Sequence, residues 1–425
     1  MAFIEVIGGK YINMDKKVVL INDTKFKGIF LSVNLMQPLN AEENSKNALV
    51  ASILKRGNEK YSTEKDLEER LAELYSSKVD INVERCGGIY NIEFSAEVIN
   101  KQFIKEDILD EVIDILYSMI YKPYKENGKF NSEYFVREKQ NLIDKIRDEK
   151  NEKRKWALKR LEQEMFEKSD YRYGALGSEE DVQKTTLDEI YLHYQKILKE
   201  SDIRIIMVGN LEGYNDIEDK LITKFNIKEE RKEIEETKIE AVKEFKEIRE
   251  TEMISQSVLC MGLSINEMNI KDIMKAYVYS NILGGTPTSK LFQNVREKES
   301  LAYYAKAQYM KHIRAIYIFS GIHISNVEKA TDVIRKQIED IKQGNITEEE
   351  FRTAKANLIL GYKEITDSRK AYARHILSNS IIYKDIIDIK TLITEIEGIS
   401  LEDIIDFSSK VEEKTLYLLG GVLDE

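Results

Sequence analysis

The order of apolar and polar positions predicts the same run of elements in two halves of the chain. A helical period over residues 104–123 precedes the segment EYFVREKQNLIDKI, and another over residues 325–344 precedes EEFRTAKANLILGYKEI. Phe135 and Asn141 of the first segment correspond to Phe351 and Asn357 of the second, both at an offset of 216 residues. This correspondence predicts an internal duplication.

Both halves also end with the same pair of elements. A helix that begins at a capping residue, Thr186 or Ser400, is followed by a strand that ends in a glycine, Gly209 or Gly420. Matching elements in the same order favour two homologous domains of roughly 200 residues each, which is a common domain size.

Each half has a pattern typical of an α+β fold. In the first half, residues 17–23 and 27–35 are apolar runs that predict strands, and residues 47–57 and 63–77 predict helices. Residues 78–98 predict a hairpin that turns at Gly87 and Gly88. Strands in one layer with helices grouped after them favour, in each domain, a mostly antiparallel sheet covered by helices on one face.

Residues 229–245 separate the two halves. This segment is dense in charge and poor in large apolar side chains, which predicts a solvated linker. We therefore expect an N-terminal domain over residues 1–228 and a C-terminal domain over residues 246–425.

Composition narrows the classes of partner. With 42% hydrophobic and 33% charged residues, the 425-residue chain is expected to fold as a globular protein. A net charge of −11 without a basic stripe argues against nucleic acid. Cys86 and Cys260 are too few for a disulfide framework, so we expect reduced thiols. There is neither a signal-peptide pattern nor an apolar run of membrane-spanning length, and we expect a cytoplasmic protein without membrane contact.

The segment LGGTPTSKLFQNVREKESLAYYAKAQY, residues 283–309, carries a resemblance to a known family. A glycine turn precedes a helix with the pattern S-x-L-F-x-x-V-R-E, and a polar turn then leads to a strand that begins L-A-Y. This order resembles the second-domain signature of the insulinase/pitrilysin family of zinc metallopeptidases, the inverzincins. The matching residues are Ser289, Leu291, Phe292, Val295, Arg296, Glu297, Leu301, Ala302 and Tyr303.

The resemblance implies two homologous domains that form half of a clamshell, and an inverted zinc motif, H-x-x-E-H, on a helix of the first domain. In that motif two histidines bind zinc and the glutamate acts as general base toward the zinc-bound water. Counting back from the turn at residues 55–57 places Ala48, Ala51 and Ser52 at the positions of the first histidine, the glutamate and the second histidine. The zinc motif is therefore degenerate.

The distal zinc ligand of the family, a glutamate on a later helix, is also missing. Asp144 and Lys145 stand where the family places it, and we assign Lys145 to that degenerate position. A shift of the alignment does not restore the motif, because the four histidines of the chain are His193, His312, His323 and His375. We expect no metal in this chain, although a site made of scattered ligands is an alternative.

Arg296 and Tyr303 resemble the arginine–tyrosine pair with which family members hold the substrate backbone and the developing oxyanion. A guanidinium is always charged and donates in a fixed fork, and a tyrosine hydroxyl can donate to an oxyanion. Spacing alone allows another interpretation, in which Arg296 pairs with Glu297 or Glu299 on the surface and Tyr303 lies in a sheet core.

Some family members are two-chain enzymes in which one chain bears zinc and the other keeps only the arginine–tyrosine pair. The resemblance thus implies a non-catalytic subunit that pairs with a zinc-bearing homologue, encloses a peptide chamber and supplies Arg296 and Tyr303 in trans. It implies no cofactor in this chain, zinc only in the partner, peptide or unfolded polypeptide as ligand, and a dimer.

The chain also resembles the motif-less bacterial subgroup described as associated with the 5-aminopentanol modification of elongation factor P. Two other functions stay open. One is a scaffold or peptide-binding module without a catalytic part, and the other is a peptidase with an atypical metal site.

Overall fold

The computed structural model describes residues 4–5, 17–227 and 234–421, and the chain forms two compact units. Unit 1 takes its described residues from 1–147, 173–237 and 365–387, and unit 2 from 148–172, 238–364 and 388–425. Each unit therefore contains a segment from the other half of the sequence.

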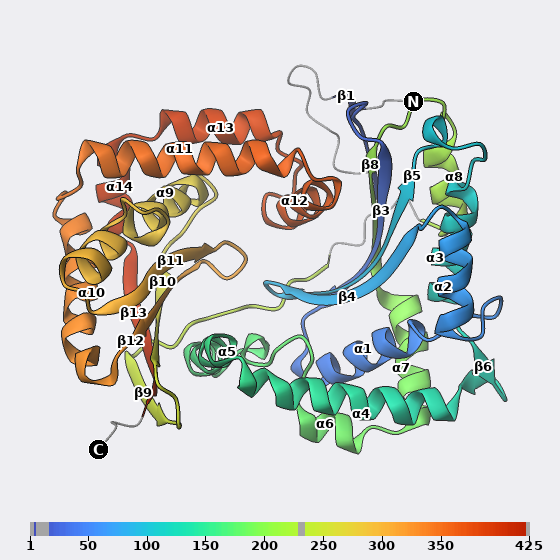
Figure 1. Ribbon diagram of the computed structural model, residues 1–425, viewed down its shortest axis with the longest axis horizontal. Helices are drawn as coiled ribbons and strands as arrows, with labels where there is room; N and C mark the ends of the chain where they lie inside the picture. The colour runs from blue at the N-terminus through green and yellow to red at the C-terminus, as the bar shows by residue number, and fades with distance from the viewer. Residues whose placement is uncertain (1–3, 6–16, 228–233, 422–425) are drawn as a thin grey trace. The chain divides into compact units, whose positions relative to one another are not determined.

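Unit 1 is built on a six-stranded sheet with the order β1-β2-β8-β3-β5-β4 (Figure 1). The β1–β2 and β2–β8 pairs are parallel, and the other neighbouring pairs are antiparallel. Its elements are β1 Ile4–Glu5, β2 Val18–Asn22, β3 Gly28–Pro38, α1 Ala41–Leu54, α2 Glu64–Glu73, β4 Lys78–Cys86, β5 Ile89–Ile99, α3 Leu109–Tyr121, β6 Lys125–Glu126, β7 Lys129–Phe130, α4 Ser132–Asp148, α6 Glu179–Lys184, α7 Leu187–Glu200, β8 Asp202–Gly209, α8 Ile217–Lys224 and α12 Arg369–Ile382.

Unit 2 is built on a five-stranded sheet with the order β11-β12-β10-β13-β9. Only the β13–β9 pair is parallel. Its elements are α5 Lys153–Met165, β9 Lys246–Thr251, β10 Ser257–Ile265, α9 Asp272–Gly284, a π-helix Phe292–Lys298, β11 Ala302–Met310, β12 Ala315–Ile322, α10 Val327–Lys342, α11 Glu348–Ile365, α13 Ile389–Gly398, α14 Leu401–Ser408 and β13 Val411–Gly420.

The two sheets share one topology. The order β2-β8-β3-β5-β4 matches β9-β13-β10-β12-β11 strand for strand, with the parallel pair at the same end. Helices α4 and α11 begin at residues 132 and 348, at the predicted offset of 216. Thr186 and Ser400 both form capping boxes, as their sequence predicts. The predicted α+β fold class with two mostly antiparallel sheets is confirmed.

A helix exchange links the two halves of the sequence. Helix α12 packs on β8 and β3 of unit 1, on the face opposite to α3 (Figure 1). Helix α5 packs on β10 and β13 of unit 2, opposite to α9 and α10. We call α5 and α12 the exchange helices. They stand at equivalent positions of the duplication, because their first residues, 153 and 369, also differ by 216.

The exchange helices cover the second face of each sheet, so the prediction that helices cover one face alone is wrong. In unit 1 this face is polar: Asn91 Nδ2 donates to Asn34 Oδ1 at 3.1 Å, and Arg374 of α12 donates to Glu93 at 2.7 Å. In unit 2 Gly262 of β10 has no side chain, and Met165 Sδ of α5 lies 2.5 Å from where a Cβ would be. The central strands β3 and β10 are consequently buried on both faces.

The predicted domain boundaries at residues 228 and 246 stay a prediction. Residues 229–233 of the predicted linker lie outside the described residues, and 234–245 form neither helix nor strand. Strand β9 follows directly, although its alternating charges did not predict a strand. Cys86 and Cys260 are buried, and neither forms a disulfide within the described residues. No helix in the described part of the chain has the length and apolar character needed to span a membrane.

Candidate functional site

The positions of the degenerate zinc motif lie on α1, within the packed interior of unit 1. Ala48 and Ala51 are buried, so their methyl groups contribute to the core. The Ser52 hydroxyl donates to the carbonyl oxygen of Ala48 at 3.0 Å, a bond within the helix's own backbone. None of the three side chains offers zinc a good ligand.

The distal position lies on α4, where Lys145 is exposed. An ion pair instead joins α4 to the turn after α1, because Arg56 Nε donates to Glu138 Oε1 at 2.5 Å. Glu138 is buried, and Arg56 also pairs with Glu64. Although burial opposes it, the Glu138 carboxylate raises the pKa of Arg56.

The residues at these four positions therefore do not fit a zinc ion. Across residues 4–5, 17–227 and 234–421, no three or more His, Cys, Asp or Glu side chains are grouped so as to hold a metal. The chemistry of the donor set agrees with the motif analysis, since alanine has no donor atom and lysine is a cation near neutral pH.

A buried histidine packs against α1 directly beside the degenerate motif. His193 Nε2 of α7 lies 2.8 Å from Oδ1 of Asn47, the residue before Ala48. Burial lowers the pKa of His193 to about 4, with the lysine charges of Lys46 and Lys196 acting in the same direction and Glu43 opposing it.

This histidine predicts a loss of stability in acid. Between pH 6.5 and 4 this histidine is protonated in the unfolded chain but stays neutral in the folded protein. The free energy of unfolding therefore falls as the pH falls. We expect His193→Gln to reduce the acid-induced loss of unfolding free energy by about 2–3 kcal/mol. Urea unfolding of both proteins at pH 7 and pH 4.5 measures this. Equal losses in the two proteins would contradict it.

Arg296 lies in the π-helix of unit 2. A π-helix is rare and is often found at functional sites. The guanidinium carbon stands 4.6 Å from the centre of the Phe292 ring, and Nε is 3.5 Å from Glu297 Oε1. The Arg296 side chain is 43% exposed. The expected surface pairing with Glu297 is thus present as a loose contact that leaves much of the guanidinium open.

Tyr303 lies at a β-bulge, where β11 has one residue more than β12. Ala302 pairs with Ile322 and Tyr304 with Gly321, so Tyr303 between them has no partner. Its side chain is 69% exposed, which contradicts the interpretation that it lies in a sheet core. Ser300, between Arg296 and Tyr303, has a positive φ of 52°. Bulges and such backbone conformations often orient functional side chains.

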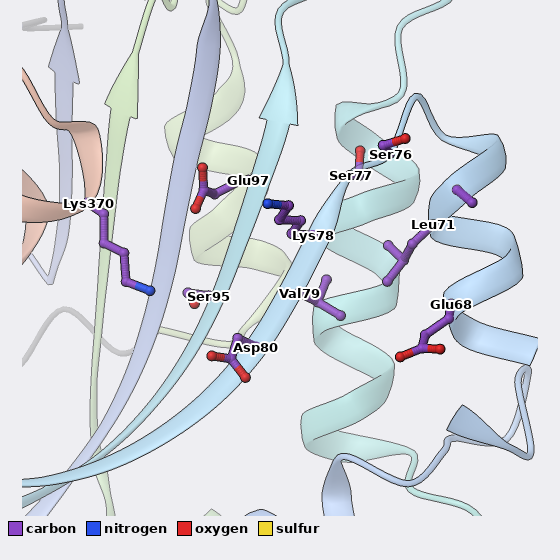
Figure 2. A pocket seen from close by; sticks show the side chains of 11 residues that line it. Glu68, Leu71, Ser76, Ser77, Lys78, Val79, Asp80, Ser95, Glu97 and Lys370 are labelled. Atoms are coloured by element: carbon purple, nitrogen blue, oxygen red, sulfur yellow. The ribbon is translucent and has the colours of Figure 1, made fainter. Parts of the chain in front are cut away.

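A cavity of about 470 Å³ lies in unit 1 at the start of β4, the outermost strand of its sheet (Figure 2). Asp80 pairs with Lys55 at 2.8 Å and Glu97 with Arg369 at 3.3 Å. Partial burial opposes it, but the Lys55 ammonium lowers the pKa of Asp80. The lining residues are Glu68, Leu71, Ala72, Ser76, Ser77, Lys78, Val79, Asp80, Ser95, Glu97 and Lys370.

The two lysines of this cavity were not predicted as site residues. Lys78 begins β4 and Lys370 is the second residue of α12, nearly 300 positions away. Neither makes an ion pair within the described residues. No local pattern marks Lys370, because only the helix exchange brings it to this sheet.

The comparisons with known proteins agree with this picture. Residues 184–358 match the family model of the peptidase M16 inactive domain. The chain is 27% identical to the probable inactive metalloprotease YmfF of Bacillus subtilis, over 99% of both chains. It is 23% identical to the non-peptidase homolog YmxG of Helicobacter pylori, over 75% of this chain and 73% of that protein.

A solved structure also shares the fold. A conserved protein from Enterococcus faecalis is 26% identical, with a TM-score of 0.85 over 98% of this chain and 99% of its own. These matches confirm the resemblance to motif-less, non-catalytic members of the insulinase (M16) family. They also agree with the prediction that the chain is not a peptidase on its own.

Proposed function

We propose that this chain, a motif-less and non-catalytic member of the insulinase (M16) family, serves as the substrate-binding subunit of a two-chain zinc peptidase. A zinc-bearing homologue supplies the metal and the general base. This chain encloses part of a peptide chamber and contributes Arg296 and Tyr303 to the bound polypeptide.

The observation that carries the proposal is the contrast between two sets of positions. At the zinc positions, Ala48 and Ala51 are packed into the core of unit 1. At the pair positions, Arg296 and Tyr303 lie in a π-helix and a β-bulge with open side chains. Residues that had only to stabilise the fold would not need these irregular and exposed positions.

The chemistry of the pair suits a polypeptide undergoing hydrolysis. A guanidinium donates to backbone carbonyl oxygens, and a tyrosine hydroxyl donates to the oxyanion that forms when water attacks a peptide carbon. Removal of one oxyanion donor typically costs about 100- to 1,000-fold in kcat. Tyr303 supplied in trans would therefore affect kcat more than KM.

The test mixes the purified chain with an H-x-x-E-H-bearing homologue from the same genome and measures cleavage of a quenched fluorescent peptide. We expect the mixture to be at least tenfold more active than the homologue alone. Arg296→Ala and Tyr303→Phe should each lower kcat by about 100-fold. Arg352→Ala, an exposed change elsewhere in unit 2, and Tyr75→Phe in unit 1 serve as controls and should leave the rate unchanged.

A homologue that is equally active alone and in the mixture would refute the proposal. So would a mixture that tolerates both Arg296→Ala and Tyr303→Phe. Zinc analysis of the purified chain separately tests the atypical metal site, which requires a stoichiometric metal.

A peptide-binding module without a catalytic part is the second candidate. The observation that favours it is the pair of edge strands: β4 and β11 each end their sheet, so each leaves one edge without a paired strand among the described residues. An extended peptide can add to such an edge through backbone hydrogen bonds. In that case the chain binds labelled peptide while the Arg296 and Tyr303 variants leave every measured rate intact.

A further inference from the structure

A second cavity, of about 590 Å³, lies within unit 2 where α5 meets the sheet. The first turn of α5 contributes Lys153 and Arg154, the loop between β9 and β10 contributes Met253 and Gln256, and β11 contributes Tyr304. The cavity is separate from the positions of the degenerate zinc motif, which belong to unit 1.

Arg154 is a cation that lines this cavity and forms no salt bridge with the described residues. Its guanidinium carbon lies 4.0 Å from the centre of the Tyr304 ring, a cation–π contact that orients the group. Of the carboxylates nearby, Glu152 pairs with Lys155 at 2.8 Å, and Glu252 pairs through Oε1 with Lys153 at 2.7 Å, while Glu252 Oε2 is buried without a hydrogen-bond partner among the described residues. Arg154 itself makes no ion pair within the described residues.

A second donor in the cavity is buried without a partner. Gln256 Nε2 is shielded from solvent and donates to no acceptor among the described residues. Both Gln256 and the Tyr304 ring lie over Gly321, where an added Cβ would be 2.5 Å from Nε2 and 2.2 Å from the ring. The absence of a side chain at Gly321 therefore allows this arrangement, and buried unpaired donors are rare enough to indicate a ligand or a water.

The N-terminal end of α5 adds positive electrostatic potential to that of Arg154. Helix α5 has 13 residues, and Glu152 at its N-cap makes no side-chain hydrogen bond to the first turn. Backbone N–H groups at such an end are unsatisfied and carry a partial positive charge. The helix end therefore favours binding of an anion, in addition to the donors of Arg154 and Gln256. A helix end without those two side chains would not be sufficient for a binding site.

The internal duplication places a basic residue at the same position of both exchange helices. Arg154 and Lys370 are the second residues of the two exchange helices, and their numbers differ by the repeat offset of 216. Each lines a cavity that includes residues of the edge strand of its own sheet: Arg154 with Tyr304 of β11, and Lys370 with Lys78, Val79 and Asp80 of β4. In both units the first residue of the exchange helix, Lys153 or Arg369, neutralises a glutamate. The second residue, Arg154 or Lys370, forms no salt bridge with the described residues, which leaves its charge available to another anion.

We propose that the cavity formed by Arg154, Gln256 and Tyr304 binds a carboxylate of the polypeptide. This inference rests on the proposed function, and it assigns that polypeptide a free C-terminus or an acidic side chain at this point. Arg154 would donate to the carboxylate oxygens, and Gln256 Nε2 would complete the set of donors once its amide turns from Gly321 toward the cavity.

Three labelled serine–alanine peptides of equal length test the proposal by fluorescence anisotropy with the full chain. One has a free C-terminal carboxylate, one is amidated, and one is amidated with an internal glutamate. We expect the first or the third to bind about tenfold more tightly than the amidated peptide. The peptide that gains affinity identifies the source of the carboxylate.

Variants of single residues test whether the preference for a carboxylate comes from this cavity. Arg154→Ala and Gly321→Ala should remove the tenfold preference, whereas Lys168→Ala, which removes an exposed charge after the other end of α5, should retain it. Trp156, the single tryptophan of the chain, stands on α5 two residues from Arg154, so its fluorescence should change on binding. Thermal unfolding of each variant checks that it is folded.

Equal affinity for the three peptides, or a preference that survives Arg154→Ala, would overturn the carboxylate site while leaving peptide binding intact. Failure of the proposed function would show separately, as an unchanged cleavage rate in the mixture with the zinc-bearing homologue.

Discussion

Separate expression of residues 1–240 and 241–425 is expected to give two chains that show no cooperative thermal unfolding until they are mixed. The first chain would lack α12, so the face of its sheet that carries Glu93 would be uncovered. The second would lack α5, and with it Leu161 and Met165, which are fully buried in unit 2. Loss of the apolar burial that each exchange helix provides, by Ile376 and Leu377 of α12 in the first case, is comparable to the marginal stability of a domain.

Circular dichroism of each chain and of the mixture measures this effect. A matched control keeps the chain intact during folding: a protease site inserted after the exposed Glu240 is cut only after purification. The nicked protein should keep the unfolding midpoint of the intact chain, because each piece holds a helix of the other. A half that unfolds alone at the midpoint of the full chain would show that the exchange helices are dispensable.

Arg374→Leu is expected to lower the free energy of unfolding by about 2–3 kcal/mol. Glu93 is only 1% exposed, and Arg374 Nη2 donates to its Oε2 at 2.7 Å. The hydrogen bond to Glu93 raises the pKa of Arg374. Removal of the guanidinium leaves a buried carboxylate uncompensated, although the 42% exposure of Arg374 admits water and moderates the loss.

Urea unfolding at pH 7 measures this loss of unfolding free energy. Two further variants serve as comparisons. Arg374→Leu combined with Glu93→Gln should recover much of the stability, because no buried charge remains. Arg369→Ala removes a more exposed pair on the same helix, at 3.3 Å from Glu97, and should cost less than about 1 kcal/mol. Equal losses for Arg374→Leu and Arg369→Ala would contradict the argument from burial.

Local features were predictable from the sequence because they depend on neighbouring residues. The caps at Thr186 and Ser400, the hairpin around Gly87 and the strand ends at Gly209 and Gly420 all occur as predicted. Each follows from a side chain or a backbone angle within a few positions. The internal duplication was also predictable from the sequence, because corresponding residues of the two halves are separated by the same offset.

The helix exchange was not predictable in this way. An amphipathic period shows that one face of α5 or α12 is buried, but it does not show which sheet buries that face. Strand β9 was missed for a different reason, because an edge strand with alternating charges has the composition of a linker.

The candidate site shows the same division. The signature around residues 283–309 located Arg296 and Tyr303, but the exposure of Tyr303 depends on how β11 pairs with β12. The π-helix likewise departs from the regular helix that the motif predicted. Arg154 and Lys370 carried no signal in the sequence, because their surroundings are assembled from distant segments.

The helix exchange also sets the order of events during translation. Between Gly209, the end of β8, and Arg369, the start of α12, a ribosome working at about 5–20 residues per second needs on the order of 10–30 s. The sheet of unit 1 is complete long before the helix that covers its polar face has been made. Helix α5 meanwhile has to wait for β10 and β13. Unit 1 is complete once α12 has been made, and unit 2 once β13 has been made, so premature termination before Arg369 leaves both of them unfinished.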